Sequence, residues 1–528
     1  MRSTFIFTLL ILSFCHLMAA SHPWFPAAAR NAQNQANDPT NPTSKETINT
    51  IIEIKESRPA TETSITMAPL TDDPGIESSL ASEKGKEGRY LIEEIIIKGN
   101  ERTREKAILR ELPIREGDSL HLHQLQQKIE AGRNNLMNTG LFNFVEIHPE
   151  DTPGKTLTLT IQVIERWNIW PLPVLELDEP NLNQWLEDPT FSAFNYGISL
   201  YLSNISGMNE RIRLAGKIGN VQTLDLQLRS RYIGNRQIVR WGLQYKLDRS
   251  KSRAYDTEEN EQLTARLRDD FISNEYLFAT ALHLRPGLYN IHRLGLAFHY
   301  HNYHDTLLTL NPRFGPDGKH RFSFFSLGYT FRRDRRDIVA YPLSGHLIEA
   351  GVTRKGLGIL SEENMDVTSL SANVRHYIRL RQQWYAAWSM YGKWSEGSTL
   401  SYFDREGLGF SRSLVRGYEH YIIDGHKFFI FKSNVKYNLL PERDGVISFI
   451  PYEQFSRIHY ALYLNLFADV GVMDDRHYLS KNDLANRWLA GGGIGLDFHT
   501  YYDIVFRSEF TVNRHGEAGF FFHLGAPI

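Results

Sequence analysis

The sequence predicts a mainly β protein, in which a transmembrane antiparallel β-barrel of about sixteen strands follows one small α+β domain. Segments of about ten residues with alternating apolar and polar positions follow one another from about Phe191 onward. Phe, Trp and Tyr together number 64, more than the 59 Lys and Arg residues. The one long apolar run lies at the N-terminus, which excludes a bundle of membrane-spanning helices, since each helix needs about 20 apolar residues.

The alternation favours a barrel over a soluble β-sandwich. In the segments Ser369–Leu380 and Ile504–Asn513, apolar residues alternate with polar ones, among them Arg507 and Glu509. A sandwich alternates as well. Here, however, charged faces lie opposite faces rich in aromatic residues, strand after strand and without an intervening helix. This pattern indicates a closed barrel with lipid outside and a wet lumen, and we expect it over residues 167–528.

Charge and cysteine content exclude several other classes. The net charge of −2 provides no basic surface for nucleic acid. The single cysteine, Cys15, excludes a disulfide framework and any metal site built from cysteines. We expect no catalytic residue, no cofactor and no metal ion. His299, His301 and His304 lie close together in sequence, but their alternation with apolar residues predicts lumen or loop positions rather than metal ligands.

The N-terminal region predicts export followed by a tether. Arg2 precedes the apolar stretch Phe5–Phe14, which is too short to span a membrane, and Ala20 offers a cleavage site. Residues 1–20 are therefore a predicted signal peptide. Residues 21–88 are rich in Pro, Asn, Thr, Ser and Glu and have too few apolar residues to form a core, so we expect a disordered tether.

Residues 89–166 predict the small α+β domain. An isoleucine-rich strand runs into Gly99-Asn100, a helix capped by Thr103 follows, and a second helix ends at Gly140. Two further strands are expected around Phe142 to Ile147 and over 156–164. This order, together with the stretch Asn138-Thr139-Gly140-Leu141-Phe142, resembles a POTRA domain, the periplasmic module of barrel assembly factors. The edges of such an open sheet can accept an extended client chain as an added strand.

The most specific resemblance lies between the eleventh and twelfth expected strands. The residues Val415-Arg416-Gly417-Tyr418 are similar to the luminal loop motif of BamA-type outer-membrane protein assembly factors, the bacterial surface antigen family. Four further stretches match that family in the same order: a turn with Asp334, Asp337, Pro342 and Gly345; a strand with Asp469 and Gly471; a glycine-rich strand at 492–496; and a closing strand with Gly519, Phe520, Phe522 and Gly525.

The loop motif and the Asp469 strand can also be interpreted physically. Apolar residues flank Asp469 on its strand at alternate positions, so its carboxylate faces the lumen, where a lone charge is costly unless it is paired. The resemblance implies Arg416 as its partner, on a loop that folds into the lumen. Gly417 then permits a tight turn, and Tyr418 wedges the loop against the wall.

Three features depart from the family pattern. Lys436 stands where many members carry a second acid on the strand after the loop, which weakens the case for a second anionic contact to Arg416. The chain ends in Ile528 rather than an aromatic residue, and it has one POTRA domain where assembly factors usually have several. Fewer docking surfaces make the standard complex with accessory assembly lipoproteins less certain.

The resemblance implies a non-enzymatic insertase of the Gram-negative outer membrane, with the POTRA domain in the periplasm. Its partners would be unfolded outer-membrane proteins, membrane lipids and, as an open alternative, accessory assembly lipoproteins. A transporter of the same superfamily, of the two-partner-secretion or translocation-and-assembly kind, remains an alternative, as does a passive porin. The closing-strand glycines leave little side-chain packing, which predicts a seam between the first and last strands that can open.

Overall fold

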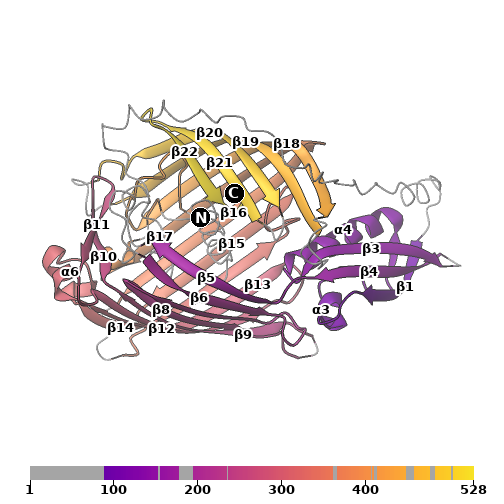
Figure 1. Ribbon diagram of the computed structural model, residues 1–528, viewed down its shortest axis with the longest axis horizontal. Coiled ribbons are helices and arrows are strands. Elements are labelled where there is room, and N and C mark those ends of the chain that lie inside the picture. Colours follow the sequence, from indigo (N-terminus) through magenta and orange to yellow (C-terminus); the bar gives the residue numbers. More distant parts are fainter. Residues whose placement is uncertain are drawn as a thin grey trace, which may run out of the picture.

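The computed structural model describes residues 89–528, apart from 153–154, 178–193, 235, 361–364, 406, 410–412, 447–456, 476–481 and 501–503. The predicted signal peptide (1–20) and tether (21–88) lie outside the described residues. The described chain forms an N-terminal α+β domain and a large curled sheet, which lie end to end along the long axis of the molecule (Figure 1).

The N-terminal domain is a four-stranded sheet in the order β2-β1-β4-β3, with β1 and β4 parallel and the other neighbours antiparallel. Its elements are β1 (Arg89–Lys98), α3 (Glu105–Leu109), β2 (Ser119–His121), α4 (Leu122–Asn138), β3 (Phe142–Thr152) and β4 (Thr156–Glu165). The apolar positions with helical spacing in α4, Leu125 and Leu136, are buried in the two core clusters of the domain.

Two details of this domain differ from the sequence prediction. Thr103 does not cap the first helix: α3 begins after Arg104, and no side chain caps it. Thr103 is instead buried, where its hydroxyl accepts a hydrogen bond of 2.8 Å from the side-chain amide of Asn204. The three-residue strand β2 was not expected, because so short a segment shows no measurable alternation. Gly140 follows α4 with φ +70°, the left-handed stop that the sequence predicts.

The second part of the chain is one 16-stranded sheet in which neighbours in sequence pair antiparallel. In chain order its strands are β5 (Ile169–Leu177), β6 (Phe194–Ser203), β7 (Arg211–Ile218), β8 (Val221–Arg229), β9 (Val239–Ser250), β12 (Ser273–Leu284), β13 (Asn290–Tyr303), β14 (Arg321–Asp334), β15 (Gly345–Lys355), β16 (Val367–Arg381), β17 (Trp384–Gly397), β18 (Lys427–Val446), β19 (Arg457–Asp474), β20 (Trp488–Thr500), β21 (Ile504–Asn513) and β22 (Ala518–Leu524). The predicted class, mainly β with sixteen antiparallel strands after one α+β domain, is confirmed.

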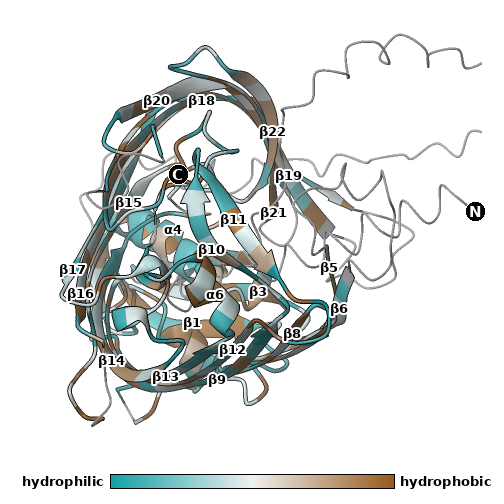
Figure 2. Cartoon of the chain, turned by 90° about the vertical axis from the view of Figure 1, so that its left-hand side faces the viewer, coloured by the Kyte–Doolittle hydropathy of each residue, from teal (hydrophilic) through white to brown (hydrophobic). Residues whose placement is uncertain are grey.

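The strands curl into a ring, as the end-on view shows (Figure 2). Alternate side chains point outward and inward, as the sequence alternation predicts. On β19, for example, Leu466 is exposed while Asn465, Phe467 and Asp469 on the opposite face are buried. No helix among the described residues is long and apolar enough to cross a bilayer.

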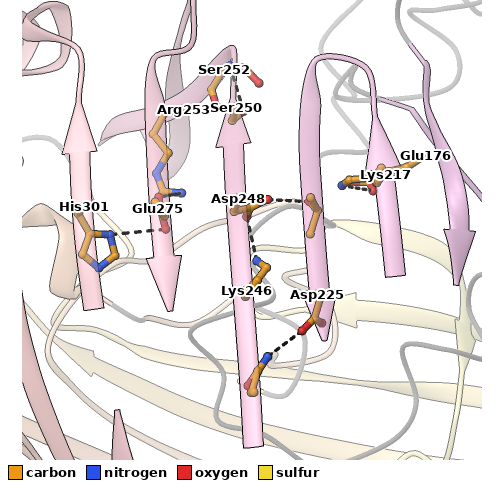
Figure 3. A network of polar contacts seen from close by, with 12 residues as sticks. Glu176, Lys217, Asp225, Lys246, Asp248, Ser250, Ser252, Arg253, Glu275 and His301 are labelled. Atoms are coloured by element: carbon orange, nitrogen blue, oxygen red, sulfur yellow. Dashed lines mark hydrogen bonds and ion pairs between the residues drawn. The ribbon is translucent and has the colours of Figure 1, made fainter. Parts of the chain in front are cut away.

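Charged side chains line the inner wall over the first strands (Figure 3). They form ion pairs within and between strands, which satisfies charges that the enclosed space would otherwise leave uncompensated. The ion pairs are Lys217–Glu176 at 2.7 Å, Lys246–Asp248 at 2.9 Å and Arg253–Glu275 at 2.9 Å. Arg253 comes from a hairpin between β9 and β12, formed by β10 (Ser252–Glu258) and β11 (Glu261–Arg266), which the sequence analysis did not predict.

Short helices lie at the same end of the barrel as this hairpin, opposite the N-terminal domain (Figure 1). These elements are α6 (Asp305–Leu310) and two 3₁₀ turns, η3 (Pro316–Gly318) and η4 (Tyr402–Asp404). An apolar cluster that includes Phe314, Tyr402 and Tyr303 joins them to the hairpin and to the adjoining strand ends.

The first strand of the barrel lies earlier than the alternation suggested. The pattern that begins near Phe191 belongs to β6, whereas the sheet starts with β5, at Ile169. Pro171 and Pro173 interrupt the β pattern of this strand, because proline is normally excluded from a strand interior.

Candidate functional site

Between β17 and β18, the eleventh and twelfth strands of the barrel, the described residues 413–426 fold back into its interior. Val415 and Tyr418 on this segment are buried in a cluster with Phe428 and Ile430 of β18 and Met473 of β19. The segment therefore packs on the inner wall by apolar contact, with Tyr418 in the wedging position that the sequence analysis expected.

Arg416 at the centre of this segment binds Asp469 through three donors. Its Nε and Nη2 donate to the two carboxylate oxygens at 2.8 and 2.5 Å, and its backbone N–H donates at 3.2 Å. Nη2 also donates to Asn434 Oδ1 at 2.9 Å, and the guanidinium lies 3.9 Å from the ring centre of Phe467. Both charged partners are 1% exposed, so the pair is shielded from solvent. A bidentate contact of this kind fixes the loop in one orientation as well as one place.

A second acid reaches Arg416 from a strand that the sequence analysis did not single out for this role. Glu509 on β21 lies 3.5 Å from Arg416 Nη1 and is fully buried. The alternation of β21 had placed Glu509 in the lumen, but alternation gives no distance between strands. Glu509 therefore supplies to Arg416 the second acidic neighbour that the family pattern would place at position 436.

Two lysines of β18 face the lumen near this site. The register of β18 and β19 places Lys432 directly opposite Asp469. Lys436 lies opposite Asn465, and its ammonium is 3.9 Å from the ring centre of Tyr341. Alternation places every second residue in the lumen, so only the register distinguishes the two lysines.

Three glycines permit the loop to approach the wall this closely. A Cβ at Gly471 would lie 2.5 Å from Val415 Cγ2, and one at Gly491 would lie 1.9 Å from the backbone oxygen of Arg416. Gly417 itself has φ +95°, a left-handed conformation that glycine adopts without strain. The glycine-rich segments of β19 and β20 thus form the flat surface on which the Arg416 segment rests.

The turn between β14 and β15 is built by its two aspartates. Asp334 binds the guanidinium groups of Arg332 and Arg336, each at 2.7 Å. Asp337 accepts hydrogen bonds from the backbone N–H groups of Leu343 and Ser344, the two residues after Pro342. Gly345 has φ +97°, and a Cβ there would meet the backbone oxygen of Arg335 at 2.0 Å. These residues therefore shape the turn.

Among the described residues, this turn is one of four barrel turns that form hydrogen bonds with the N-terminal domain. The contacts are Arg104 N–H to Gly207 O at 3.0 Å, Arg110 Nε to Gln237 O at 2.9 Å, Asn138 Nδ2 to Asp337 O at 2.6 Å, and a bidentate pair of Arg285 with Glu111 at 2.8 and 2.6 Å. The turn motif and the Asn138 stretch, which the sequence analysis treated separately, are thus the two sides of one interface.

Glu111 is the buried centre of that interface. It is 4% exposed and also contacts Arg110 at 2.8 Å. Burial by itself would raise the pKa of the Glu111 carboxyl, but attraction and hydrogen bonding from Arg285, together with Arg110, outweigh burial and hold the pKa below its ordinary value of 4.5. The carboxylate is therefore charged in the docked domain at neutral pH.

β5 and β22 are the two ends of the sheet, and no ladder joins them among the residues that the structure describes. On β22, Phe520 and Phe522 point outward and are 59% and 77% exposed. A Cβ at Gly519 would lie 2.5 Å from the ring of Phe521. The sequence analysis placed Gly525 in the closing strand, but the structure places it outside that strand. It follows the end of β22 at Leu524 and turns the chain with φ +102°.

The clustered histidines have packing partners. His301 stacks on Phe322 and Phe324, and His299 Nε2 forms a hydrogen bond of 2.9 Å with Ser326. In the described part of the chain, no group of three or more His, Cys, Asp or Glu residues could hold a metal ion.

Comparison with known proteins gives one family and several structures. Residues 90–166 match the family model described as "POTRA: Surface antigen variable number repeat". No curated protein matches the chain in sequence. Among solved structures, BamA from Haemophilus ducreyi lacking POTRA domains 1–3 is 14% identical, with 83% of this chain and 84% of that chain covered and a TM-score of 0.46. CdiB from Escherichia coli is 14% identical, with coverage of 83% and 76% and a TM-score of 0.49.

The chain thus joins one domain that matches the POTRA family model to a sheet of sixteen antiparallel strands.

Proposed function

We propose that the protein is an outer-membrane insertase, which receives unfolded β-barrel proteins in the periplasm and assembles them into the outer membrane. Its clients are unfolded outer-membrane proteins, and the surrounding lipid receives the product. Accessory assembly lipoproteins fit the proposal as periplasmic partners of the single POTRA domain.

The observation that carries this proposal is the seam between β5 and β22, which no ladder joins among the described residues. In a bilayer, every backbone N–H and C=O must find a partner, so a barrel normally closes its own edge. A barrel whose first and last strands lack a mutual ladder offers two strand edges at the boundary between lumen and lipid. Strand addition there would satisfy the edge and would move a client laterally into the membrane without an energy source such as ATP.

The Arg416 segment supports a lateral route over an axial one. Arg416 and Tyr418 are held inside the lumen by buried polar and apolar contacts, and the POTRA domain contacts four turns at the periplasmic end. We propose that Val415, Arg416, Gly417 and Tyr418 hold the inner wall of β18 to β21 in a fixed form, with Asp469 and Gly471 as the anchoring partners. The seam strands beside this wall then have a rigid support.

The alternative within the superfamily is a transporter of one dedicated protein. The paired charges along the wall of β5 to β13 favour this alternative, because they could line a path for a polar extended chain (Figure 3). A passive porin is the third candidate, although it would need neither a POTRA domain nor an anchored luminal segment.

Depletion of the protein, followed by a proteome of the outer membrane, separates these functions. Broad loss of barrel proteins is the result expected of an insertase. Loss of a single exported protein would instead indicate a transporter, and an unchanged outer membrane would indicate a porin. Complementation with the wild-type chain and with Arg416→Ala serves as the matched control, and only the wild type should restore the barrel proteins fully.

A further inference from the structure

A row of polar side chains on the outer wall of the barrel has no part in the proposed function. Five neighbouring strands contribute one residue each, and the register places each residue directly opposite the next. The polar row consists of Gln222 on β8, Arg249 on β9, Asn274 on β12, Asn302 on β13 and Arg321 on β14. These strands lie side by side in the ring (Figure 2), and β5 to β7 separate them from the seam.

The polar row faces outward, at the end of the barrel opposite the N-terminal domain. Alternate residues of a strand share a face. Tyr276, two residues after Asn274 on β12, and Tyr329, on the same parity as Arg321 on β14, are both exposed on the outer surface. Asn274 lies near the start of β12, whereas Arg285, which contacts the N-terminal domain, follows the end of that strand.

Two arginines give the polar row its charge. Arg249 Nε donates to Asn274 Oδ1 at 2.8 Å, and its guanidinium lies 4.1 Å from the ring centre of Phe271. Arg321 Nε donates to Asn302 Oδ1 at 3.4 Å. Among the described residues, no carboxylate lies within ion-pairing distance of either guanidinium. An amide oxygen orients a guanidinium but leaves its charge and its other donors available to a ligand.

A hollow in the outer wall adjoins the polar row. Its volume is about 700 Å³, and it extends from Asn274 and Asn302 of the row to Tyr276, Phe278 and Tyr300. Most of its lining residues are aromatic, and the rings of Tyr276 and Tyr300 meet edge to face with their centres 5.6 Å apart. A ligand that fits both features has an anionic polar end and an apolar body.

We propose that the polar row and the hollow bind a lipid with a phosphorylated headgroup, in the leaflet farther from the N-terminal domain. Phosphate oxygens accept hydrogen bonds from Arg249 and Arg321, and the acyl chains cover the hollow. Three strand spacings of about 4.8 Å separate the two arginines, about 14 Å in all, so a headgroup with two separated phosphates reaches both. The inference uses the membrane location that the proposed function includes, and not the insertase activity.

A phosphorylated lipid explains the site better than other occupants do. Free inorganic phosphate would bind the guanidinium groups but would leave the aromatic hollow uncovered. A lipid without net negative charge would cover the hollow but would leave two positive charges at the membrane boundary. A second copy of the chain, packed on this face about a two-fold axis, would place the same arginines against each other.

The first test measures binding of a phosphorylated lipid to the full-length protein. The protein is mixed in detergent with an acylated disaccharide that carries two phosphates, and native mass spectrometry counts the bound lipid. Arg249→Ala with Arg321→Ala should bind at least about tenfold more weakly, since charge-assisted hydrogen bonds are lost. Arg354→Ala is the matched control, because Arg354 also faces outward but Asp366 binds it at 2.5 Å. The control should bind as the wild type does.

The second test examines the hollow and changes no charge. Phe278→Ala removes an exposed ring from the lining, and Leu294→Ala removes an exposed outer side chain of β13 that does not line the hollow. The shift in gel mobility on heating shows that both variants are folded. We expect Phe278→Ala to weaken lipid binding severalfold and Leu294→Ala to leave it unchanged. Equal binding by the two variants would overturn the role of the hollow.

The remaining measurements distinguish the occupants. The same disaccharide lipid without its phosphates should bind as weakly as a zwitterionic phospholipid does. Equal binding of the dephosphorylated lipid, or equal binding by all variants, would show an ordinary lipid shell and overturn the inference. Displacement of the lipid by inorganic phosphate would indicate a site for the free anion and overturn the lipid assignment. A dimer that Arg249→Ala with Arg321→Ala changes would indicate a second copy and would also overturn it.

Discussion

Arg416 is the residue on which the luminal segment depends, because it is buried among two acids, an amide and an aromatic ring. Arg416→Ala leaves Asp469 and Glu509 buried without this partner, and Asp469→Ala leaves the guanidinium with weaker contacts. Breaking a buried pair costs about 3–5 kcal/mol. The wall keeps its own ladder, so the cost should appear as a displaced segment. Protease added from outside should cut near Tyr418 in both variants and spare the wild type.

The double variant makes this prediction sharper. Arg416→Ala with Asp469→Ala should be no worse than the worse single variant, since both changes damage one contact. The charge swap, Arg416→Asp with Asp469→Arg, should recover protection only in part, because an arginine at 469 would stand opposite Lys432. Strictly additive losses in the double-mutant cycle would contradict the pairing.

Gly491 provides a test that changes no charge. Gly491→Ala would place a Cβ 1.9 Å from the backbone oxygen of Arg416, so the segment must move away from β20. Overpacking of this kind costs about 1–3 kcal/mol. We expect the same cleavage near Tyr418, with the barrel still folded. Gly216→Ala on β7 is the matched control, because a Cβ there meets nothing within 4 Å and should leave the segment protected.

At the scale of elements, alternation revealed the strands because each has one exposed, largely apolar outer face and one face toward the lumen. The alternation did not predict β5, because two of its outward positions are prolines, which normally mark the end of a strand. The β10–β11 hairpin and α6 were not predicted because they lie outside the 16-stranded sheet. The partnership of Glu509 with Arg416 also depends on how the sheet curls, which a sequence period does not contain.

The C-terminal segment after β22 is an element whose role can be measured. Ile528→Ala removes apolar contact with Tyr377 and Ala387, and a buried Ile→Ala change costs about 2–5 kcal/mol. We expect the folded, fast-migrating form of the barrel to be lost at a lower temperature on heated gels. Leu310→Ala on α6 is the control, since that residue is 46% exposed. Equal melting of the two variants would show that the segment does not hold β22.

At the scale of the molecule, Glu111 joins the POTRA domain to the barrel. Glu111→Gln keeps the shape but removes the charge that Arg285 and Arg110 bind, so the domain should detach at neutral pH. Hydrogen exchange at the 335–344 turn reports the detachment. Glu130→Gln, an exposed position on α4, is the control and should leave exchange unchanged.

The same carboxylate predicts a pH dependence of docking. Its pKa is depressed in the docked state below the ordinary value of 4.5. Docking is therefore fully stabilised above that value and is lost as the pH falls through the depressed pKa. Exchange at the 335–344 turn should rise on acidification in the wild type, and Glu111→Gln should lack this step. A step of equal size in both proteins would exclude Glu111 as its origin.

The central claim, that this protein assembles barrels into membranes, is tested most directly by reconstitution. The purified full-length chain is placed in liposomes, and an eight-stranded outer-membrane barrel unfolded in urea is diluted onto them. Its folded form is followed by the shift in gel mobility on heating. The account predicts faster folding than in empty liposomes and than with Arg416→Ala. A rate equal to that of empty liposomes, with the reconstituted protein itself folded, would contradict it.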